Sequence, residues 1–380
     1  MHVVIVSRGI PTPQYPLNGI FEWDQVMALA KAGVEVDYFV VDLRSFRRLR
    51  PWGIRHGVKD GVRWHSISLP VGAIPLWGLC KIGAMALRKL YRNTFTKTDC
   101  VPDIIHAHFT EMGYMAAELA EEEKIPLVIT EHSSLMIPPI ISDTLKQIAT
   151  KSYQGAACVI AVSSSLKKSI YQHTGVNAEV IPNIVAEVFR YGKREHAGMK
   201  FVSVATLIYE KRIDILLRAF ALLSVVCQDA TLAIVGDGEV RKSLKTLAEE
   251  LHILNKVRFY GVLPRQDINV LYETCDCFIL PSAAETFGVA YIEAMAAGLP
   301  VIATRCGGPE DFVTEENGIL VDIDDVDGLK NAMLSMYLSR EQYDASAIAA
   351  NTAARFSASA VAKRILNIYN KVLDEKGLVR

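Results

Sequence analysis

The chain has 380 residues, which is too long for one ordinary hydrophobic core and predicts two domains. Apolar residues make up 51% of it and charged residues 22%, a balance that is typical of globular proteins and excludes a disordered chain. The formal net charge of −1 hides a basic stretch from Val40 to Lys97, which holds twelve lysines and arginines but only two acids.

The first half of the chain predicts a parallel sheet. The N-terminal stretch HVVIVSRGI has the composition of a buried strand, a helix follows over residues 19–33, and Gly33 ends that helix. Four further apolar stretches predict strands, at residues 34–41, 103–109, 126–132 and 158–163. Short apolar strands that alternate with helices are typical of βαβ units.

The pattern starts again after the polar and basic stretch 182–200, which we interpret as the interdomain linker. Six more strands are predicted, at residues 200–207, 230–238, 257–264, 277–283, 300–306 and 318–322. The last helix, 357–373, carries apolar residues at helical spacing, so one of its faces must be buried. We expect an α/β protein with two doubly wound, Rossmann-like domains that face each other across a cleft.

Ligands of doubly wound sheets bind beside the carboxyl ends of the strands, and the loop FILPSAAETFGVAYIEAMAAG lies in such a place. A helix that starts near Phe287 or Gly288 leaves the amides of Phe287, Gly288 and Val289 free to hold a phosphate or a sugar oxygen. Glu285 precedes this helix and Glu293 lies inside it, so both carboxylates can face one ligand. The alternative is that Glu285 stabilises the helix N-terminus and Glu293 is solvated.

The E-x7-E spacing of these acids, with EAMAAGLPVIAT around the second, resembles retaining glycosyltransferases of the GT-B fold, the glycogen-synthase-like group. Further stretches occur in that family's order and spacing: VIPN, VATLIYEK, IVGDGEVRKSL, VRFYGVLPRQDINVLYETCDCFILPS and ATRCGGPEDFV. The first half matches more loosely, through DIIHAHF and PLVITEHSS. The resemblance implies an acceptor-binding domain at 1–187, a donor-binding domain at 188–363, and a helix at 364–380 that packs back on the first domain.

The resemblance also assigns roles to the acids and to a lysine. It implies that Glu293 hydrogen-bonds the ribose of a nucleotide-sugar donor and that Glu285 lies at the transferred sugar, because carboxylates accept hydroxyl hydrogen bonds strongly. It implies a diphosphate held by an arginine and a lysine five residues apart. Here the lysine is Lys211, but Thr206 stands at the arginine position. Thr206 brings no charge, so a nearby arginine is expected to substitute, with two candidates, Arg212 and Arg305.

Four other residues belong to the predicted donor site or to the catalytic set. Gly19 lets its loop close over a phosphate or an acceptor, or is an ordinary turn glycine. Gly236 lies in a G-x-G turn that lacks the third glycine of a dinucleotide fingerprint, and Val262 lies in the loop after VRFYG. His132 matches a family position that faces the reacting sugar, and it can bind the sugar's primary hydroxyl or orient the acceptor.

Metal and redox chemistry are not expected. His106 and His108 lack an identifiable third ligand, so we interpret them as structural, with His108 the better candidate for the cleft. The acids at 322–325, DIDD, match the metal motif of another sugar-transferase fold, but helix capping explains them. Cys275 and Cys277 lack a second ligand pair, so zinc is improbable. Scattered cysteines and no secretory signal peptide predict a reducing cytosol. No cofactor is expected.

The resemblance implies metal-independent, retaining transfer of a hexose from a nucleotide-diphosphate sugar, with UDP favoured. The acceptor would be a hydroxyl of a glycan or of a lipid-linked acceptor in cell-surface polysaccharide or glycolipid synthesis. Lys211, Glu285 and His132 would form the catalytic set. Two alternatives are a nucleotide-sugar epimerase of the same fold and a non-catalytic nucleotide-sugar-binding subunit, which Thr206 favours. The incomplete glycine pattern disfavours an NAD enzyme.

The basic stretch predicts where the acceptor lies. Its cations alternate with Trp52, Trp77 and aliphatic residues, which suits the surface of an anionic bilayer. The longest uncharged apolar run, residues 69–80, is too short to span a bilayer. We predict a monotopic enzyme at the cytoplasmic face of the cell membrane and no nucleic-acid partner. The alternative is a pair of basic helices packed on their own domain.

Overall fold

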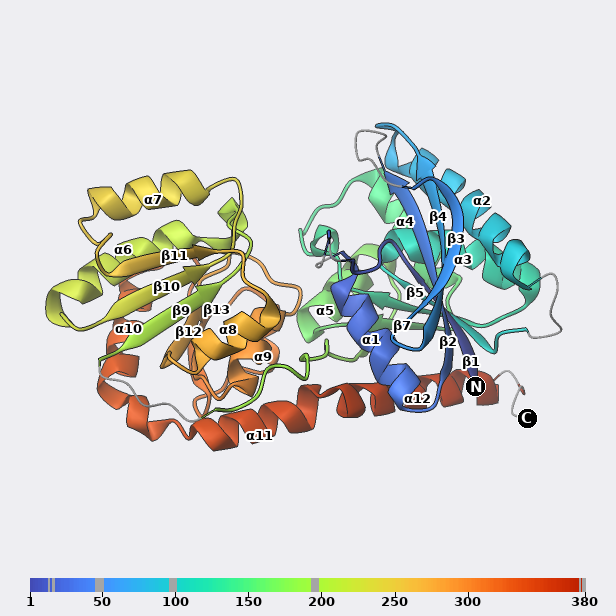
Figure 1. The fold of residues 1–380 in the computed structure, drawn as a ribbon. Helices are drawn as coiled ribbons and strands as arrows, with labels where there is room; N and C mark the ends of the chain where they lie inside the picture. Colours follow the sequence, from blue (N-terminus) through green and yellow to red (C-terminus); the bar gives the residue numbers. More distant parts are fainter. Residues whose placement is uncertain are drawn as a thin grey trace. The chain divides into compact units, whose positions relative to one another are not determined.

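The structure is a computed structural model that describes residues 1–12, 14–15, 18–44, 51–95, 101–192, 198–375 and 377. It divides into two compact units, Met1–Ile184 with Ala358–Arg380 (unit 1) and Val185–Ser357 (unit 2). Each unit is a sheet with helices on its faces, as Figure 1 shows, so the predicted α/β class is confirmed. Some of the predicted segments lie outside the described residues: Arg47, Arg48, Arg50 and Lys97 of the basic stretch and residues 193–197 of the linker.

Unit 1 contains an eight-stranded sheet in the order β3-β4-β2-β1-β5-β6-β7-β8. Its strands are β1 (His2–Ser7), β2 (Glu35–Arg44), β3 (Gly53–Lys59), β4 (Val62–Pro70), β5 (Ile104–His108), β6 (Leu127–Glu131), β7 (Cys158–Ala161) and β8 (Glu179–Val180). Its helices are α1 (Ile20–Lys31), α2 (Leu76–Phe95), α3 (Thr110–Glu123), η1 (Ser134–Met136), α4 (Asp143–Gln154), α5 (Ser164–Thr174) and α12 (Ala358–Glu375). The strand pairs are parallel except that β3 runs antiparallel to β4.

Unit 2 contains a six-stranded parallel sheet in the order β11-β10-β9-β12-β13-β14. Its strands are β9 (Lys200–Val204), β10 (Thr231–Val235), β11 (Val257–Gly261), β12 (Cys277–Leu280), β13 (Val301–Thr304) and β14 (Gly318–Val321). Its helices are η2 (Tyr209–Lys211), α6 (Ile213–Val226), α7 (Arg241–Glu250), α8 (Arg265–Tyr272), α9 (Val289–Ala296), η3 (Gly308–Asp311), α10 (Val326–Ser339), η4 (Arg340–Gln342) and α11 (Ala345–Phe356).

The basic stretch folds differently from the expected pair of helices. Residues 53–70 form the β3–β4 hairpin, and a single helix, α2, follows it. The hairpin turns at Asp60 and Gly61, whose positive φ angles (50° and 84°) are those that a two-residue type I′ turn requires. The helix-pair interpretation is therefore wrong for residues 53–70. The sequence does carry the signal, an Asp-Gly pair inside VKDGVRW.

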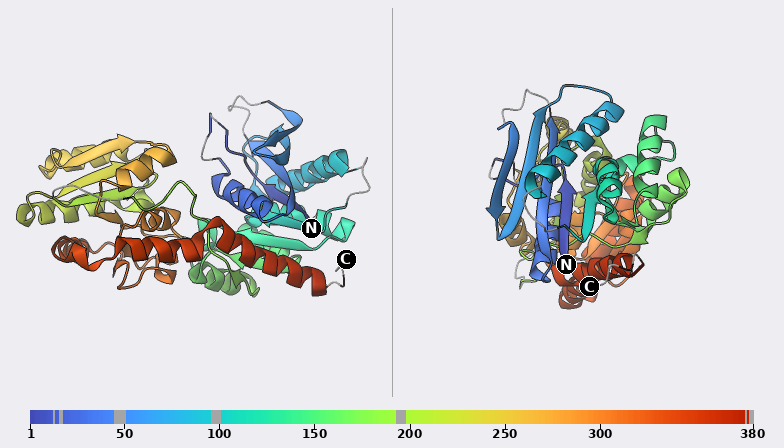
Figure 2. Two further views of the ribbon diagram at one scale, coloured as in Figure 1. Left: turned by 60° about the horizontal axis from the view of Figure 1, so that its bottom comes forward. Right: turned by 90° about the vertical axis from the view of Figure 1, so that its right-hand side faces the viewer.

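The last helix belongs to the core of unit 1. α12 packs beside α1 (Figure 2). Its residues Val361, Ile365, Tyr369 and Val372 lie in the same buried cluster as the inward side chains of β1 and β2. These positions follow one another at intervals of three or four, so they form one stripe along the helix. The prediction that this helix buries one face and packs back on the first half of the chain is confirmed.

Each sheet has one point where the strand order reverses. In unit 2 the chain runs outward from β9 to β10 and β11 and then returns to form β12 on the other side of β9. In unit 1 the same reversal separates β1 from β5. The loops that leave two such neighbouring strands diverge to opposite faces of the sheet, which opens a crevice at their carboxyl ends. The predicted site residues follow these strands or their neighbours.

A buried carboxylate ties β1, β2 and β4 together in unit 1. The Asp37 side chain is only 2% exposed and accepts hydrogen bonds from Arg63 Nε (2.8 Å), and it also contacts His65 Nε2 (2.9 Å) and His2 Nε2 (2.7 Å). Burial alone would raise the pKa of Asp37, but the bonds from Arg63, His2 and His65 hold that pKa far below its ordinary value. Arg63 also pairs with Glu35, an exposed acid (2.7 Å).

Asp37→Asn should lower the free energy of unfolding of unit 1 by roughly 3 kcal/mol at pH 7, because Arg63 loses its buried counter-charge. The matched control Glu35→Gln, which removes the exposed acid from the same arginine, should cost less than about 1 kcal/mol. Unfolding in guanidinium chloride followed by tryptophan fluorescence measures both in unit 1, since all four tryptophans lie there (Trp23, Trp52, Trp64 and Trp77).

The stability difference between wild type and Asp37→Asn should narrow in acid. Because the pKa of Asp37 is lower in the folded than in the unfolded chain, its contribution is complete above the unfolded value of about 3.9 and is lost as the pH falls below that value. Equal losses of unfolding free energy in Asp37→Asn and Glu35→Gln at pH 7 would contradict the role of Asp37 as the buried partner of Arg63.

Candidate functional site

A mostly buried ion pair joins the loops after β9 and β12 in unit 2. Lys211 ends η2, and its Nζ lies 2.7 Å from Glu285 Oε1. Ser282 Oγ donates to the same oxygen at 2.9 Å. The lysine side chain is 20% exposed and the glutamate 11% exposed, so each charge has lost most of its water. Two predicted site residues that are distant in the sequence, Lys211 and Glu285, are thus in direct contact.

The backbone of Glu285 pairs with the loop after β13. Glu285 N donates to Cys306 O (3.2 Å), and Gly308 N donates to Glu285 O (2.9 Å). A Cβ on Gly308 would lie 2.4 Å from the backbone of Phe287, so only glycine permits this approach. The GGPED sequence after β13 therefore fixes the height of Glu285 above the sheet.

Helix α9 starts where the sequence predicts an anion-binding helix N-terminus. Its first residue is Val289, and Gly288 is the N-cap with φ +96°. Phe287 is buried, and its ring packs against Phe312 and Phe356 (centroids 5.3 and 5.8 Å apart). The phenylalanine anchors the turn, and the first amides of α9 have no acceptor within the helix itself. The geometry is suited to an anionic oxygen near Gly288 and Val289.

Glu293 lies in the interior of α9 and is 8% exposed. Its Oε1 lies 3.6 Å from Nε of Arg265, the first residue of α8. The alternative that Glu293 is a solvated helix position is therefore wrong, because its carboxylate is buried against an arginine. Arg265 is not among the residues that the sequence motifs predict, although it follows the strand VRFYG in the same way that Lys211 and Glu285 follow theirs.

The glycine turn after β10 packs against the loop after β9. A Cβ on Gly236 would lie 1.8 Å from Ala205 O, and one on Gly238 would lie 2.2 Å from Leu207 O. These contacts require glycine whether or not a nucleotide binds, which favours the loop-geometry interpretation of Gly236. Two other predicted donor-site residues, Thr206 and Val262, are exposed.

The acids of the DIDD stretch have partners within the protein. Asp325 caps α10 by accepting from Gly328 N (2.8 Å), as predicted. Asp324 pairs with Arg212 (2.9 Å), and Asp322 lies 3.8 Å from Arg305. Both arginines proposed to replace the one missing at position 206 are thus beside an acid. In the described part of the chain, no group of three or more His, Cys, Asp or Glu side chains is arranged to hold a metal.

In unit 1, Gly19 is the N-cap of α1 and has φ +74°. A Cβ at this position would lie 2.3 Å from Gly9 O, so the loop after β1 folds tightly against the start of α1. This geometry explains the glycine without a ligand and is also compatible with a bound phosphate. The role of Gly19 in binding therefore stays a prediction.

Three histidines line up at the carboxyl ends of β5 and β6. His106 contacts Tyr369 OH (2.6 Å) and Thr130 Oγ1 (2.7 Å), as expected of a structural residue. His108 Nδ1 lies 3.0 Å from His132 Nε2. Burial lowers the pKa of His106 to about 3 and that of His132 to about 4, and it lowers the pKa of His108 well below its ordinary value. All three rings are therefore neutral at pH 7.

Phe109 borders this histidine row in a strained conformation. It is not glycine, yet its φ is +72° and its ψ is 154°. Its ring contacts His132 (centroids 5.2 Å apart), and the guanidinium of Arg8 lies over it at 3.9 Å. Backbone strain of this kind persists only where the surroundings fix the residue, and it often marks functional sites. No motif or local pattern in the sequence points to Phe109 or Arg8.

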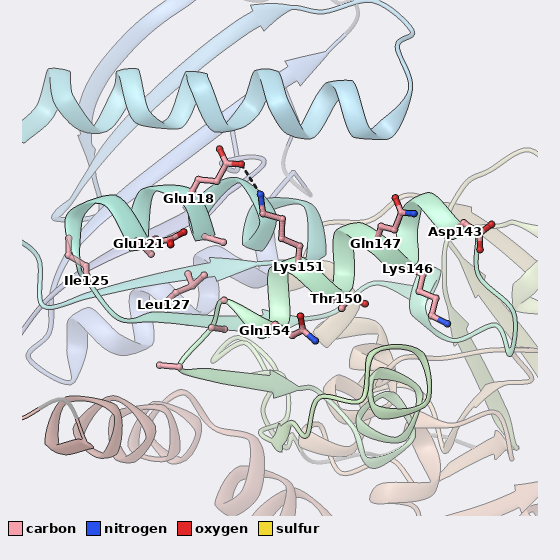
Figure 3. Close-up of a pocket in the computed structure, with 15 residues that line it drawn as sticks. Glu118, Glu121, Ile125, Leu127, Asp143, Lys146, Gln147, Thr150, Lys151 and Gln154 are labelled. Atoms are coloured by element: carbon pink, nitrogen blue, oxygen red, sulfur yellow. Dashed lines mark hydrogen bonds and ion pairs between the residues drawn. The ribbon is translucent and has the colours of Figure 1, made fainter.

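A pocket of about 990 Å³ in unit 1 lies apart from these residues. It is lined by α3 and α4, and Figure 3 shows Glu118 and Lys151 meeting at its edge, with Nζ and Oε1 2.9 Å apart. Its lining includes charges of both signs, such as Glu121 and Lys146. None of the predicted site residues lines it.

The cations of α2 pair largely with acids of α3. Lys81 lies 3.2 Å from Glu118, and Arg88 and Arg92 contact Glu122. In the part of the chain that the structure describes, no helix is both long and apolar enough to cross a membrane. Three other residues of α2 are exposed, Trp77 (55%), Met85 (59%) and Lys89.

Two family profiles match consecutive parts of the chain. Residues 23–187 match the family described as Glycosyltransferase Family 4, and residues 189–353 match Glycosyl transferases group 1. The two matches meet within a few residues of the border between unit 1 and unit 2.

Two relatives by sequence extend over most of the chain. D-inositol 3-phosphate glycosyltransferase of Corynebacterium urealyticum is 29% identical over 388 residues, which covers 92% of this chain and 89% of that protein. TuaC of Bacillus subtilis, a putative teichuronic acid biosynthesis glycosyltransferase, is 26% identical over 346 residues, or 84% of this chain and 85% of that protein.

Solved structures show the same fold. Sucrose-phosphate synthase from Thermosynechococcus elongatus has a TM-score of 0.78 at 21% identity, covering 98% of this chain and 99% of that one. Anabaena HepE, solved in complex with UDP-glucose, has a TM-score of 0.73 at 20% identity, covering 98% of this chain and 100% of that one. The resemblance drawn from E-x7-E and the neighbouring motifs is confirmed, and this chain belongs to the glycosyl transferases group 1 family, with the GT-B fold.

Proposed function

We propose that this glycosyltransferase moves a hexose from a nucleotide-diphosphate sugar, with UDP as the favoured nucleotide, to a hydroxyl of a glycan or lipid-linked acceptor, with retention of configuration. The observation that carries the proposal is the Lys211–Glu285 pair beside the start of α9, at the strand-order reversal of unit 2. A cation and free helix amides suit a diphosphate, and a carboxylate suits sugar hydroxyls.

The charged site residues of unit 2 and the first amides of α9 then each have a role in the proposal. Lys211 and the amides of Gly288 and Val289 hold the diphosphate. Glu293, fixed by Arg265, accepts the ribose hydroxyls. Glu285 accepts hydroxyls of the transferred sugar while its other contacts, to Lys211 and Ser282, hold it in place. The relatives that carry glycosyltransferase names and the UDP-glucose complex of HepE support this choice of donor.

The proposed chemistry needs no metal and no covalent intermediate. The incoming hydroxyl attacks on the face that the phosphate leaves, and the departing phosphate accepts the hydroxyl's proton. Lys211 and the α9 amides stabilise the charge that develops on that phosphate, so catalysis rests on positioning and electrostatics. His132 of unit 1, neutral at pH 7, is proposed to contact the sugar or the acceptor.

A panel of nucleotide sugars tests the donor. UDP-sugars should raise the melting temperature more than GDP- or ADP-sugars do, because a ligand that binds only the folded chain stabilises it. The measurement is a thermal shift at equal ligand concentrations, with UDP alone as a reference for the nucleotide contribution. A chain that no nucleotide sugar stabilises would not be a transferase of this class.

Substitution of the two acids should affect different steps, donor binding for Glu293 and turnover for Glu285. Glu293→Ala should weaken donor binding roughly tenfold to a hundredfold, the range for a lost hydrogen bond to a charged group. Glu285→Ala should mainly reduce turnover, because it removes a contact to the reacting sugar and frees Lys211 from its partner. Titration calorimetry with the donor that gives the largest thermal shift, together with initial rates, separates the two effects.

The exposed acid Glu316 provides the matched control, and Glu316→Gln should change neither quantity. Full activity of both alanine variants would make the site assignment wrong. Donor binding without any turnover, hydrolysis included, would favour the non-catalytic subunit, and conversion of the sugar without an acceptor would favour the epimerase.

We propose further that unit 1 docks on an anionic membrane surface through the exposed side of α2, at the cytoplasmic face of the cell membrane. Trp77, Met85 and Lys89 are exposed and lie at intervals of four or eight along the helix, in the same row as Lys81, whose charge is paired with Glu118. Trp77 and Met85 offer apolar area, and Lys89 is an exposed cation. An apolar stripe with a flanking cation is typical of helices that lie in the bilayer interface.

Vesicle co-sedimentation tests this surface. Binding should require phosphatidylglycerol, fall with salt, and decrease several-fold in Trp77→Ser/Lys89→Ser, because both the apolar and the electrostatic contacts are lost. Tyr171→Ser/Lys168→Ser is the matched control, since it removes an exposed aromatic residue and an exposed lysine from α5 of the same unit. No salt-sensitive binding, or equal losses in both double variants, would remove the membrane proposal and leave the transferase proposal standing.

A further inference from the structure

His108 and His132 share a single hydrogen bond whose direction the structure can decide. Their nitrogens Nδ1 and Nε2 are 3.0 Å apart, whereas the ring centroids are 5.2 Å apart and the ring planes differ by 14°. The two rings therefore meet edge to edge, as a hydrogen bond between imidazoles requires. Because both are neutral, one ring donates and the other accepts.

Each of the two rings has one nitrogen outside the shared bond, here called its outer nitrogen. These outer nitrogens differ from the nitrogens of His106 in their hydrogen bonding. Both nitrogens of His106 have partners, Tyr369 and Thr130. By contrast, His108 Nε2 and His132 Nδ1 are buried and have no hydrogen-bond partner among the described residues. The Asn183 side chain lies near His132 and raises its pKa, but it does not meet the geometry of a hydrogen bond to Nδ1.

The direction of the shared bond decides which outer nitrogen carries the second proton. If His132 donated, His108 would carry an N–H on Nε2, inside a side chain that is 0% exposed and that has no acceptor in reach. Orphaned N–H groups are rare and more costly than orphaned acceptors. If His108 donates, the remaining N–H lies on His132 Nδ1. This nitrogen is also buried, but the His132 side chain as a whole is only partly buried and borders Asn183, whose amide oxygen is an acceptor.

The backbone of His132 is fixed independently of its ring. Glu131 Oε1 accepts from the amides of His132 (2.9 Å) and Ser133 (2.6 Å). Its Oε2 accepts from Tyr153 OH (2.6 Å) and from Thr110 Oγ1. This buried carboxylate therefore fixes the turn after β6, and the remaining freedom of His132 is the orientation of its ring.

We propose that His108 is a positioning residue: its Nδ1–H donates to His132 Nε2 and so holds His132 as the Nδ1–H tautomer, a hydrogen-bond donor to an oxygen of the sugar or the acceptor. The part that concerns the ligand rests on the proposed function. In this tautomer His132 donates to a hydroxyl or phosphate oxygen and does not act as a general base through Nδ1. Arg8, which lies over Phe109 beside His132, also disfavours a positive imidazolium.

The test combines histidine NMR with kinetics. In ¹⁵N-histidine-labelled wild type at pH 7, the signals of His132, identified by their loss in His132→Gln, should show a protonated Nδ1 and a bare Nε2. His108→Leu removes the donor at similar volume, so His132 should become a mixture of tautomers. The kcat of transfer should fall roughly tenfold, the size of one hydrogen bond, with a smaller change in the donor KM.

His108→Asn keeps an N–H near the place of Nδ1 and should restore most of the tautomer preference and of kcat. Tryptophan fluorescence unfolding checks that each variant folds. If His108→Leu does not fold, the NMR spectra of the wild type and of His108→Asn still show which tautomer His132 adopts. A wild-type His132 protonated on Nε2, or a His108→Leu variant with unchanged tautomer and kcat, would overturn the proposal. The NMR result needs no substrate, so it is independent of whether sugar transfer is found.

Discussion

The site of unit 2 depends on one constraint: a carboxylate that is almost wholly removed from water must have a positive partner. Glu285 finds that partner in Lys211, 74 residues earlier in the chain, because the strand order places β9 and β12 side by side. Neither charge is stable in this place without the other. The surrounding features serve the same arrangement: Ser282 donates to the carboxylate, and Gly308 permits the close backbone approach that fixes its height.

Unit 1 stabilises the buried polar side chains at its strand ends in a different way. At the strand ends beside its own reversal of strand order it holds neutral imidazoles in place of an ion pair, and burial keeps them neutral. The buried carboxylate there, Glu131, accepts hydrogen bonds from four uncharged donors. One unit thus offers charge suited to a diphosphate, and the other offers directed, uncharged hydrogen bonds suited to hydroxyls. This division is in keeping with the proposed anionic donor and the proposed alcohol acceptor.

The basic stretch illustrates the difference between charge in a sequence and charge on a surface. Twelve cations against two acids predict a strongly positive region. In the fold, Lys81, Arg88 and Arg92 meet Glu118 and Glu122 of α3, acids that lie well beyond the stretch in the chain. The local excess of charge is therefore partly neutralised, and the membrane proposal rests on the exposed side chains of α2, Trp77, Met85 and Lys89.

The sequence alone determined the fold class, the positions of eleven of the fourteen strands in the described part of the chain, the burial of one face of the last helix, and the family. These follow from strand composition, helical periodicity and loop motifs, which are local properties. The sequence also indicated which loops follow strands and hence where Glu285, Glu293 and Lys211 would lie. Only the tertiary structure decided that Lys211 pairs with Glu285, that Arg265 meets Glu293, and that His108 contacts His132, since these pairs depend on strand order. The β3–β4 hairpin was not predicted, although its Asp-Gly turn is a local signal that the sequence does contain. Phe109 is the opposite case, because nothing local favours a positive φ at phenylalanine and only its packed surroundings impose it.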